Sequence, residues 1–156
     1  MTPDERLAAL ESGCSPFAIA RMTSGFAVMG DQQYLAGYCL LLAFPKVAQL
    51  NDLPEADQLS FLADMAQLGS AVRAATGCMR VNYGIYGNLD PFLHAHVWPR
   101  YASEDESMRT MPPFTFPADF RNAPEHVYDA ETHDPLKLRI AAILKLSESK
   151  RTAMPQ

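Results

Sequence analysis

Hydrophobic and polar positions alternate along residues 92–98, a pattern typical of a β-strand with two different faces. Three aliphatic side chains share one face: Leu93, Ala95 and Val97. The aromatic and imidazole side chains share the other face: Phe92, His94, His96 and Trp98. The aliphatic face is expected to pack on a core, so both imidazoles would lie together on the opposite face. Pro99 predicts the end of the strand or a sheet edge, because proline has no N–H to donate.

Four further segments have strand patterns. Residues 37–44 form the longest continuous apolar run and predict a strand buried on both faces. Residues 26–29 predict its antiparallel partner in a hairpin, and residues 16–21 and 78–83 predict two more strands. Gly84, Gly87 and Asn88 then predict a tight loop before the histidine strand.

Three segments have helical patterns. Thr2 begins the first, as a hydroxyl cap followed by proline and two acids. The second runs to about Thr76, with Asp52 and Glu55 at capping-box spacing and Gly77 as its C-terminal stop. The third is expected to begin at Asp134-Pro135 and to give way to a frayed tail from Ser147.

The segment after Tyr101 differs in character from the rest of the chain. Residues 103–106 form an acidic run, with which Arg100 can pair instead of joining a binding site. Residues 111–117 are rich in proline and aromatic side chains, which predicts an extended strap packed on a surface or a crossing to a partner subunit.

Composition excludes several classes of protein. A formal net charge of −5 gives no general attraction for nucleic acid, so any phosphate site must be local. No segment approaches the roughly 20 apolar residues that span a bilayer. Acidic residues within the first twenty positions do not fit a signal peptide. The three cysteines have no metal-binding spacing and are expected to be reduced, so we expect a cytoplasmic protein.

Two imidazoles on one strand face have three common uses. They bind a metal, they perform nucleophilic and acid–base chemistry, or they are hydrogen-bonded parts of a sheet. The spacing alone does not choose between these uses.

Residues 82–101 resemble the signature of the histidine triad superfamily of nucleotide hydrolases and transferases. That pattern reads His-φ-His-φ-His-φ-φ, where φ is apolar, after an Asn and a Gly-rich loop. Here His94 and His96 occupy the second and third triad positions, and Phe92 occupies the first, as in bacterial branches with a variant triad. Tyr38 stands where many members have a further His. A weaker similarity covers residues 15–101.

The resemblance implies an α+β fold, with an antiparallel sheet of about five strands packed with helices. Residues 1–156 would form a single domain, with a core over 15–101 and a C-terminal extension and helix over 102–150. Family members commonly form homodimers, and we expect one here. No membrane or nucleic-acid partner is expected.

The resemblance also implies a reaction and a set of site residues. His94 would attack the α-phosphorus of a nucleotide, and His96 would contact the phosphate or protonate the leaving group. Gly87 and Asn88 would contact the phosphate, Asn82 would bind the phosphate chain or orient the ligand, and Asp31 would contact the ribose. Dinucleoside polyphosphates or nucleoside phosphoramidates are the expected substrates. No metal or other cofactor is required, and Mg²⁺ would enter only with a polyphosphate.

Two alternatives stay open at this point. Phe92 cannot hydrogen-bond through its side chain, so the protein could bind nucleotides with little or no turnover. A metal-dependent hydrolase would instead combine His94 and His96 with His126, His133 or a remote carboxylate.

Overall fold

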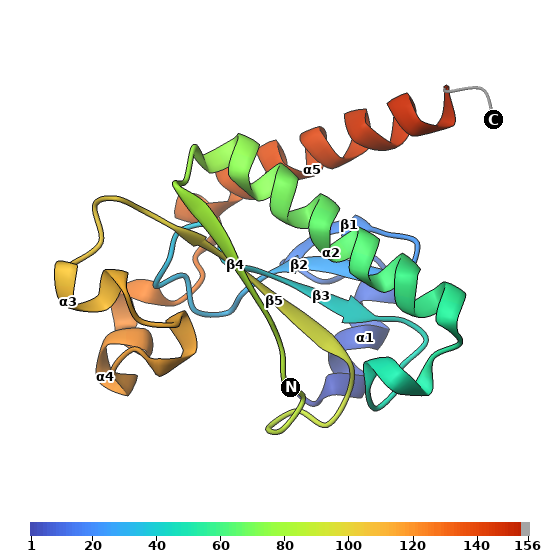
Figure 1. Ribbon diagram of the computed structural model, residues 1–156, viewed down its shortest axis with the longest axis horizontal. Helices are drawn as coiled ribbons and strands as arrows, with labels where there is room; N and C mark the ends of the chain where they lie inside the picture. Colours follow the sequence, from blue (N-terminus) through green and yellow to red (C-terminus); the bar gives the residue numbers. More distant parts are fainter. Residues whose placement is uncertain (154–156) are drawn as a thin grey trace.

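The computed structural model describes residues 1–153 of the 156-residue chain, and a five-stranded antiparallel sheet lies at its centre (Figure 1). The strand order is β1-β2-β3-β5-β4. The bounds are β1 (Ala18–Arg21), β2 (Gly25–Met29), β3 (Cys39–Ala43), β4 (Arg80–Ile85) and β5 (His94–Arg100). The fold is therefore α+β, and the five strands and the β2–β3 hairpin expected from the sequence are confirmed.

Helices surround the sheet. The three long ones are α1 (Pro3–Glu11), α2 (Glu55–Thr76) and α5 (Ala130–Thr152). The extension adds two one-turn helices, α3 (Glu106–Arg109) and α4 (Ala118–Arg121). Three 3₁₀ turns complete the set: η1 (Leu50–Asp52), η2 (Pro113–Thr115) and η3 (Pro124–His126). Within residues 1–153 no helix combines the length and the apolar content needed to cross a bilayer.

The two faces of the sheet are covered differently. Helices α2 and α5 lie side by side over one face (Figure 1), where they bury the aliphatic side of β5, with Leu93, Ala95 and Val97 at most 1% exposed. On the other face, α1 packs Leu7 and Leu10 against Phe92, while the extension packs Phe116 beside Trp98. The imidazole side of β5 thus lies between two separate covers, which leaves room for a pocket.

The sequence predicted the first helix and the stop of the second correctly. Thr2 forms a complete capping box with Glu5 at the start of α1. Gly77 ends α2 in a left-handed conformation, with a φ of 65°. Strand β3 is largely buried, as its continuous apolar run predicted.

Four predicted boundaries were wrong. Asp52 does not cap α2, because it belongs to the turn η1 and the helix begins only after Pro54. Pro99 does not end β5, which runs to Arg100 and keeps pairing with β4. The alternative prediction of a sheet edge agrees with the structure on the β3 side, because the pairing with β3 already ends at Val97 and the missing N–H of Pro99 is tolerated.

The other two wrong boundaries are the start and the end of α5, and one further correction concerns residues 111–117. Helix α5 begins at Ala130, because the Asp129 side chain accepts from the Thr132 N–H, and Pro135 lies inside the helix. It continues to Thr152, beyond the expected tail at Ser147, and residues 154–156 lie outside the described part. The strap at 111–117 is not fully extended, since it contains the turn η2.

Candidate functional site

Strand β5 places His94 on the open face with one ring nitrogen already occupied. The His94 ring is buried at 6% exposure, and its Nδ1 lies 2.9 Å from the Phe92 carbonyl oxygen. A carbonyl oxygen only accepts, so Nδ1 carries the hydrogen and donates. In neutral His94 the Nε2 atom therefore has a free lone pair, which is the form of imidazole that can act as a nucleophile.

His96 is held in the opposite tautomer. Its Nδ1 lies 2.6 Å from the Tyr38 hydroxyl oxygen. Burial raises the pKa of Tyr38 well above its ordinary value, so the hydroxyl keeps its hydrogen. Among the described residues this Nδ1 is the only hydrogen-bond partner of the hydroxyl, so we assign the donated hydrogen to Tyr38 and the bare nitrogen to Nδ1. Burial, helped by the neighbouring His94, lowers the pKa of His96 to about 4. At neutral pH the ring is uncharged, and its hydrogen lies on Nε2.

Aromatic packing fixes the two rings. The centroids of His94 and His96 are 5.0 Å apart in an edge-on arrangement. The Trp98 ring stacks on His96 at 4.7 Å with an interplanar angle of 3°. The indole N–H of Trp98 donates to the Tyr34 hydroxyl at 2.8 Å, so the stack is itself tied down. One bare nitrogen and one N–H donor are thus held next to each other.

Both histidines line a pocket of about 280 Å³. Helix α1 and the chain start contribute Met1, Pro3 and Arg6, and the extension contributes Phe114, Arg121 and Asn122. The remaining wall comes from the sheet and its loops: Asp31, Gln32, Tyr34, Tyr38, Leu40, Leu42, Asp90, Phe92 and Trp98. The volume is close to the lower end of the roughly 300–1,000 Å³ typical of small-molecule sites.

Asp31 is the one predicted ligand contact, apart from the histidines, that reaches this wall. Its two carboxylate oxygens accept from Nη1 and Nη2 of Arg6 at 2.8 and 2.6 Å. The ion pair joins the turn after β2 to α1. The sequence does not point to Arg6, because nothing in a helical segment indicates a partner 25 residues away.

The other predicted ligand contacts lie elsewhere. Asn82 accepts from Arg100 Nη1 at 2.8 Å and faces a different hollow, between β4 and the extension. Gly87, with a φ of 67°, and the exposed Asn88 belong to the β4–β5 loop, but it is Asp90 of this loop that lines the histidine pocket. The structure therefore brings together His94, His96 and Asp31 at one pocket. Asn82, Gly87 and Asn88 lie outside its wall.

The remaining histidines are also outside the pocket. His126 Nδ1 lies 2.7 Å from the Phe120 carbonyl oxygen, and His133 Nδ1 lies 2.9 Å from that of Asp129. Neither ring completes a ligand set with His94 and His96. In the described part of the chain, no group of three or more His, Cys, Asp or Glu side chains is arranged to hold a metal ion.

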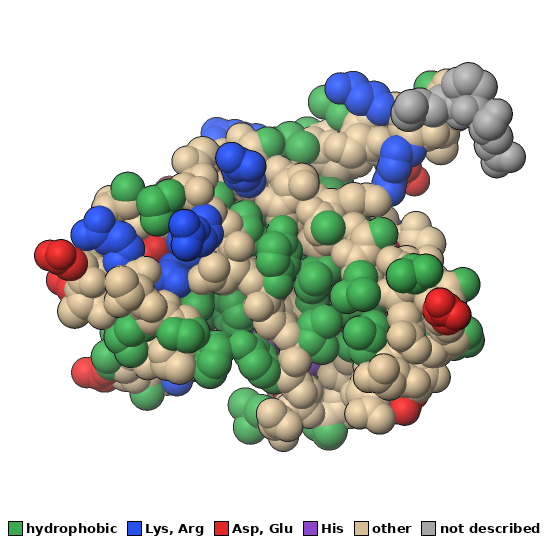
Figure 2. All heavy atoms as spheres, viewed as in Figure 1, with side chains coloured by type: hydrophobic (Ala, Val, Ile, Leu, Met, Phe, Trp, Pro, Cys, Tyr) green, Lys and Arg blue, Asp and Glu red, His purple; other side chains and the backbone are tan. Residues whose placement is uncertain are grey.

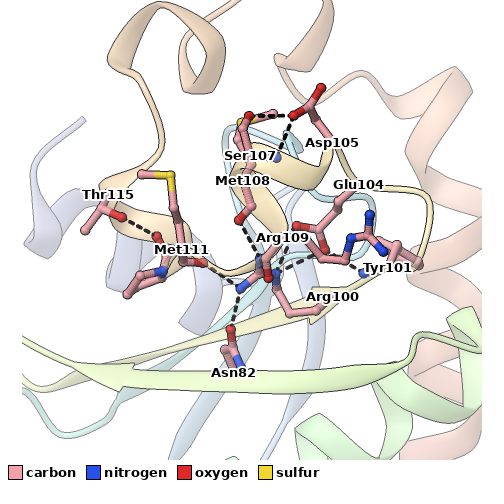
Figure 3. A network of polar contacts seen from close by, with 11 residues as sticks. Asn82, Arg100, Tyr101, Glu104, Asp105, Ser107, Met108, Arg109, Met111 and Thr115 are labelled. Carbon is pink, nitrogen blue, oxygen red and sulfur yellow. Dashed lines mark hydrogen bonds and ion pairs between the residues drawn. The ribbon is translucent and has the colours of Figure 1, made fainter.

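A buried arginine attaches the extension to the sheet (Figure 3). Arg100, at 5% exposure, forms an ion pair with Glu104 at 2.9 Å, so the predicted pairing with the acidic run is confirmed. Its guanidinium also donates to the backbone carbonyls of Met108, Arg109 and Met111. These bonds fold the chain after β5 back over the sheet, and Phe114, Arg121 and Asn122 reach the pocket as a result.

Comparison of the sequence with known proteins finds no match, whereas comparison of the structure finds several histidine triad proteins. No family model matches the chain, and no curated protein matches it. A histidine triad protein from Sinorhizobium meliloti 1021 superposes with a TM-score of 0.68 at 18% identity, over 81% of this chain and 87% of that one. A histidine triad protein from Marinobacter aquaeolei gives 0.67 at 19% identity, over 91% and 94%.

A hypothetical histidine triad nucleotide-binding protein from Sulfolobus tokodaii gives a TM-score of 0.71 at 10% identity, over 97% of this chain and 99% of that one. Similarity at these identities establishes the fold. The fold that the resemblance of residues 82–101 implied is therefore the one that the chain adopts.

Proposed function

We propose that this chain, which has the fold of the histidine triad proteins, belongs to that superfamily and cleaves a bond at the α-phosphate of a nucleotide derivative. The observation that carries the proposal is the pairing of a bare Nε2 on His94 with an N–H on His96 at one pocket. The Phe92 carbonyl and the Tyr38 hydroxyl hold the two tautomers. A nucleophile beside a donor for the phosphoryl oxygens is what phosphoryl transfer requires.

The first step forms a bond from His94 Nε2 to the α-phosphorus. The bond between phosphorus and the leaving group breaks, and its electron pair leaves with that group. The imidazole then carries a positive charge, which the Phe92 carbonyl stabilises through the Nδ1 hydrogen. Water next attacks phosphorus, the P–N bond breaks with its electron pair returning to Nε2, and one water proton passes to solvent.

His96 acts as a hydrogen-bond donor to the phosphoryl oxygens rather than as a general acid. If Nε2 released its proton, Nδ1 would have to take the Tyr38 proton, and burial raises the pKa of that hydroxyl. Of the two roles that the sequence left open for His96, contact with the phosphate is therefore better supported than protonation of the leaving group. A neutral donor that stays neutral requires no proton transfer during the step.

Phe92 does not remove the support of His94, although it replaces the first triad histidine. The group that orients His94 is the backbone carbonyl of residue 92, which any side chain would present. The Phe92 ring itself packs with Leu7 and Leu10 of α1. The hydrogen bond from His94 to the Phe92 carbonyl therefore favours an enzyme over the alternative, a nucleotide-binding protein with little turnover.

The other predicted ligand contacts are assigned roles according to whether they line the pocket. Asp31, oriented by Arg6, is the proposed ribose contact. Gly87 and Asn88 would reach the phosphate only if the loop that contains Asp90 moved toward it, and Asn82 is occupied by Arg100. The mechanism uses no cofactor, and Mg²⁺ would accompany only a polyphosphate substrate. Dinucleoside polyphosphates remain the proposed substrates.

A homodimer is proposed from the surface of α2 and the edge strand β4. Hydrophobic side chains gather over these two elements (Figure 2). Five of them are between 36% and 61% exposed: Leu59, Leu62, Met79, Tyr83 and Ile85. An unpaired edge with apolar neighbours is suited to pairing with a second copy. Light scattering on the purified protein tests this, with Tyr83→Asp expected to give monomers.

We also propose that the chain forms a single domain and that the protein is cytoplasmic. Helix α5 packs Ile140 and Leu144 into the same core as the strands, which favours one domain over residues 1–156. A cytoplasmic location remains a proposal, to be tested by fractionation of cells that produce the protein.

The reaction is tested by product analysis with dinucleoside polyphosphates and adenosine phosphoramidates. The wild type should release AMP and, on rapid quenching in alkaline denaturant, which preserves a P–N bond, carry an adenylyl group on a histidine. His94→Ala should lose all turnover while its circular dichroism stays unchanged, and His126→Ala, outside the pocket, should keep full activity. Undiminished turnover in His94→Ala would refute the mechanism. Tight AMP binding without product in the wild type would select the alternative.

A further inference from the structure

We propose that Arg121 of the extension binds the leaving group, and that this group departs as a phosphate oxyanion rather than as an amine. The inference rests on the proposed function and specifies its substrate class. It is based on the position of one guanidinium, on its lack of a protein partner, and on the hydrogen bond that holds His96.

Arg121 is the last residue of α4 and lines the histidine pocket. Its Nε donates to the Phe116 carbonyl at 2.9 Å. Phe116 is 2% exposed and packs against Tyr34, with ring centroids 6.1 Å apart. The guanidinium is therefore held by a buried residue, and the side chain is attached at Nε rather than at its outer nitrogens.

The outer nitrogens of Arg121 are available to a ligand. Within residues 1–153, no hydrogen bond joins its Nη1 or Nη2 to another residue, and no carboxylate lies within 4.0 Å of it. Arg6, which also lines the pocket, is neutralised by Asp31. Arg100, which attaches the extension to the sheet, is neutralised by Glu104. Of the two arginines in the described pocket wall, Arg121 is thus the one that is left to pair with an anion.

Its charge acts at the end of the pocket where His96 lies. Arg121 is bonded to Phe116, whose ring packs on Tyr34, and the centroids of Tyr34 and Tyr38 lie 5.6 Å apart. In agreement, the Arg121 charge opposes the burial that raises the pKa of both tyrosines. Tyr38 is the residue bonded to His96, and Tyr34 is bonded to Trp98. An anionic group next to the phosphate on this side of His96 would therefore meet the guanidinium.

The chemistry of the leaving group agrees with this position. An amine leaves well only if it receives a proton, and His96 is a poor source of one while the Tyr38 hydroxyl donates to its Nδ1, so amines should leave slowly. A phosphate, a pyrophosphate or a nucleotide leaves as an anion and needs charge neutralisation instead. Arg121 supplies that neutralisation in a geometry that matches two phosphate oxygens.

Binding measurements test the inference without relying on turnover. The probes are AMP and α,β-methylene-ADP, which adds one phosphate through a bond that cannot be hydrolysed. By titration calorimetry, the wild type should bind α,β-methylene-ADP about tenfold more tightly than AMP, as expected for a charge-assisted contact. Arg121→Gln should lose this ratio, and Arg121→Lys should keep part of it.

The matched control is Arg109→Gln, which removes the same charge from an exposed position on α3 that faces a different hollow. It should keep the tenfold ratio. A wild type that binds AMP without any gain from the second phosphate overturns the inference alone, as does a full gain in Arg121→Gln. A wild type that binds neither compound overturns the proposed function as well.

Turnover distinguishes phosphate from carboxylate as the anion. Three adenylates are compared: a dinucleoside polyphosphate, a phosphoramidate of a neutral amine, and one of an amine that bears a carboxylate. Arg121→Gln should lower kcat/KM more than tenfold for the first and less than twofold for the second. An equal loss on the first two, or a loss confined to the carboxylate-bearing substrate, contradicts a phosphate leaving group.

Discussion

The Tyr38 hydroxyl lies 2.6 Å from Nδ1 of His96, and this contact decides which nitrogen of His96 carries the hydrogen. Tyr38 immediately precedes β3, whose residues Leu40 and Leu42 pair with His96 and His94. The residue that sets the tautomer therefore stands directly before the strand that pairs with β5. The Tyr38 and His96 rings also stack, with an interplanar angle of 13°.

Tyr38→Phe should reduce kcat by about tenfold, because one hydrogen bond of roughly 1–2 kcal/mol that holds the His96 tautomer is lost. KM should change little, since the aromatic ring remains in the pocket wall. Steady-state kinetics over pH 5–9 measures both constants. Tyr34→Phe, which alters the hydroxyl bonded to Trp98 but not to a histidine, is the control and should stay within about threefold. An equal loss in both variants would indicate a packing effect instead.

Stability should fall on acidification because of His96. Its pKa is about 4 in the folded protein and 6.5 in the reference state, so between these values only the unfolded chain takes up the proton. The contribution is lost as pH falls from 6.5 toward 4, by up to about 3 kcal/mol. Urea unfolding of the wild type and His96→Gln at several pH values measures the difference. The two curves should be parallel above pH 7, and parallel curves throughout would contradict the prediction.

Phe92→His should restore the full triad motif without raising activity. The Phe92 side chain is 4% exposed in an apolar cluster, so an imidazole there would be buried without a described partner, at a cost of about 1–3 kcal/mol. Thermal unfolding should show a lower Tm, and kcat should stay within about threefold because the carbonyl still orients His94. Phe92→Leu is the apolar control. A large gain in kcat with Phe92→His would show that the side chain, rather than the carbonyl, supports His94.

Arg100→Met should destabilise the fold by about 3–5 kcal/mol, because the buried Glu104 carboxylate loses its cationic partner. The double variant Arg100→Met/Glu104→Met should recover part of that loss, since no uncompensated charge remains. The comparison is Lys46→Met, which breaks an exposed ion pair with Asp4 and should cost less than about 1 kcal/mol. Chemical denaturation measures all three, and equal losses for Arg100→Met and Lys46→Met would contradict the assignment.

Much of the site could be predicted from local patterns. Alternation along β5 placed His94 and His96 on one face, and both side chains line the pocket. The placement of Asn82 and Asn88 could not be predicted in this way. Asn82 is taken by Arg100, and a loop position gives no information about which of its residues line the pocket.

The amino-acid sequence by itself determined the strands, the two faces of β5 and the histidine pair, because side-chain direction in a strand follows from a two-residue period. Only the tertiary structure decided the partners of that pair. Tyr38, Arg6 and Arg121 come from three segments far apart in the chain, and the bonds from Arg100 to backbone carbonyls of the extension hold it against the sheet beside the pocket. Such contacts depend on how separate elements pack, and no short-range pattern encodes them.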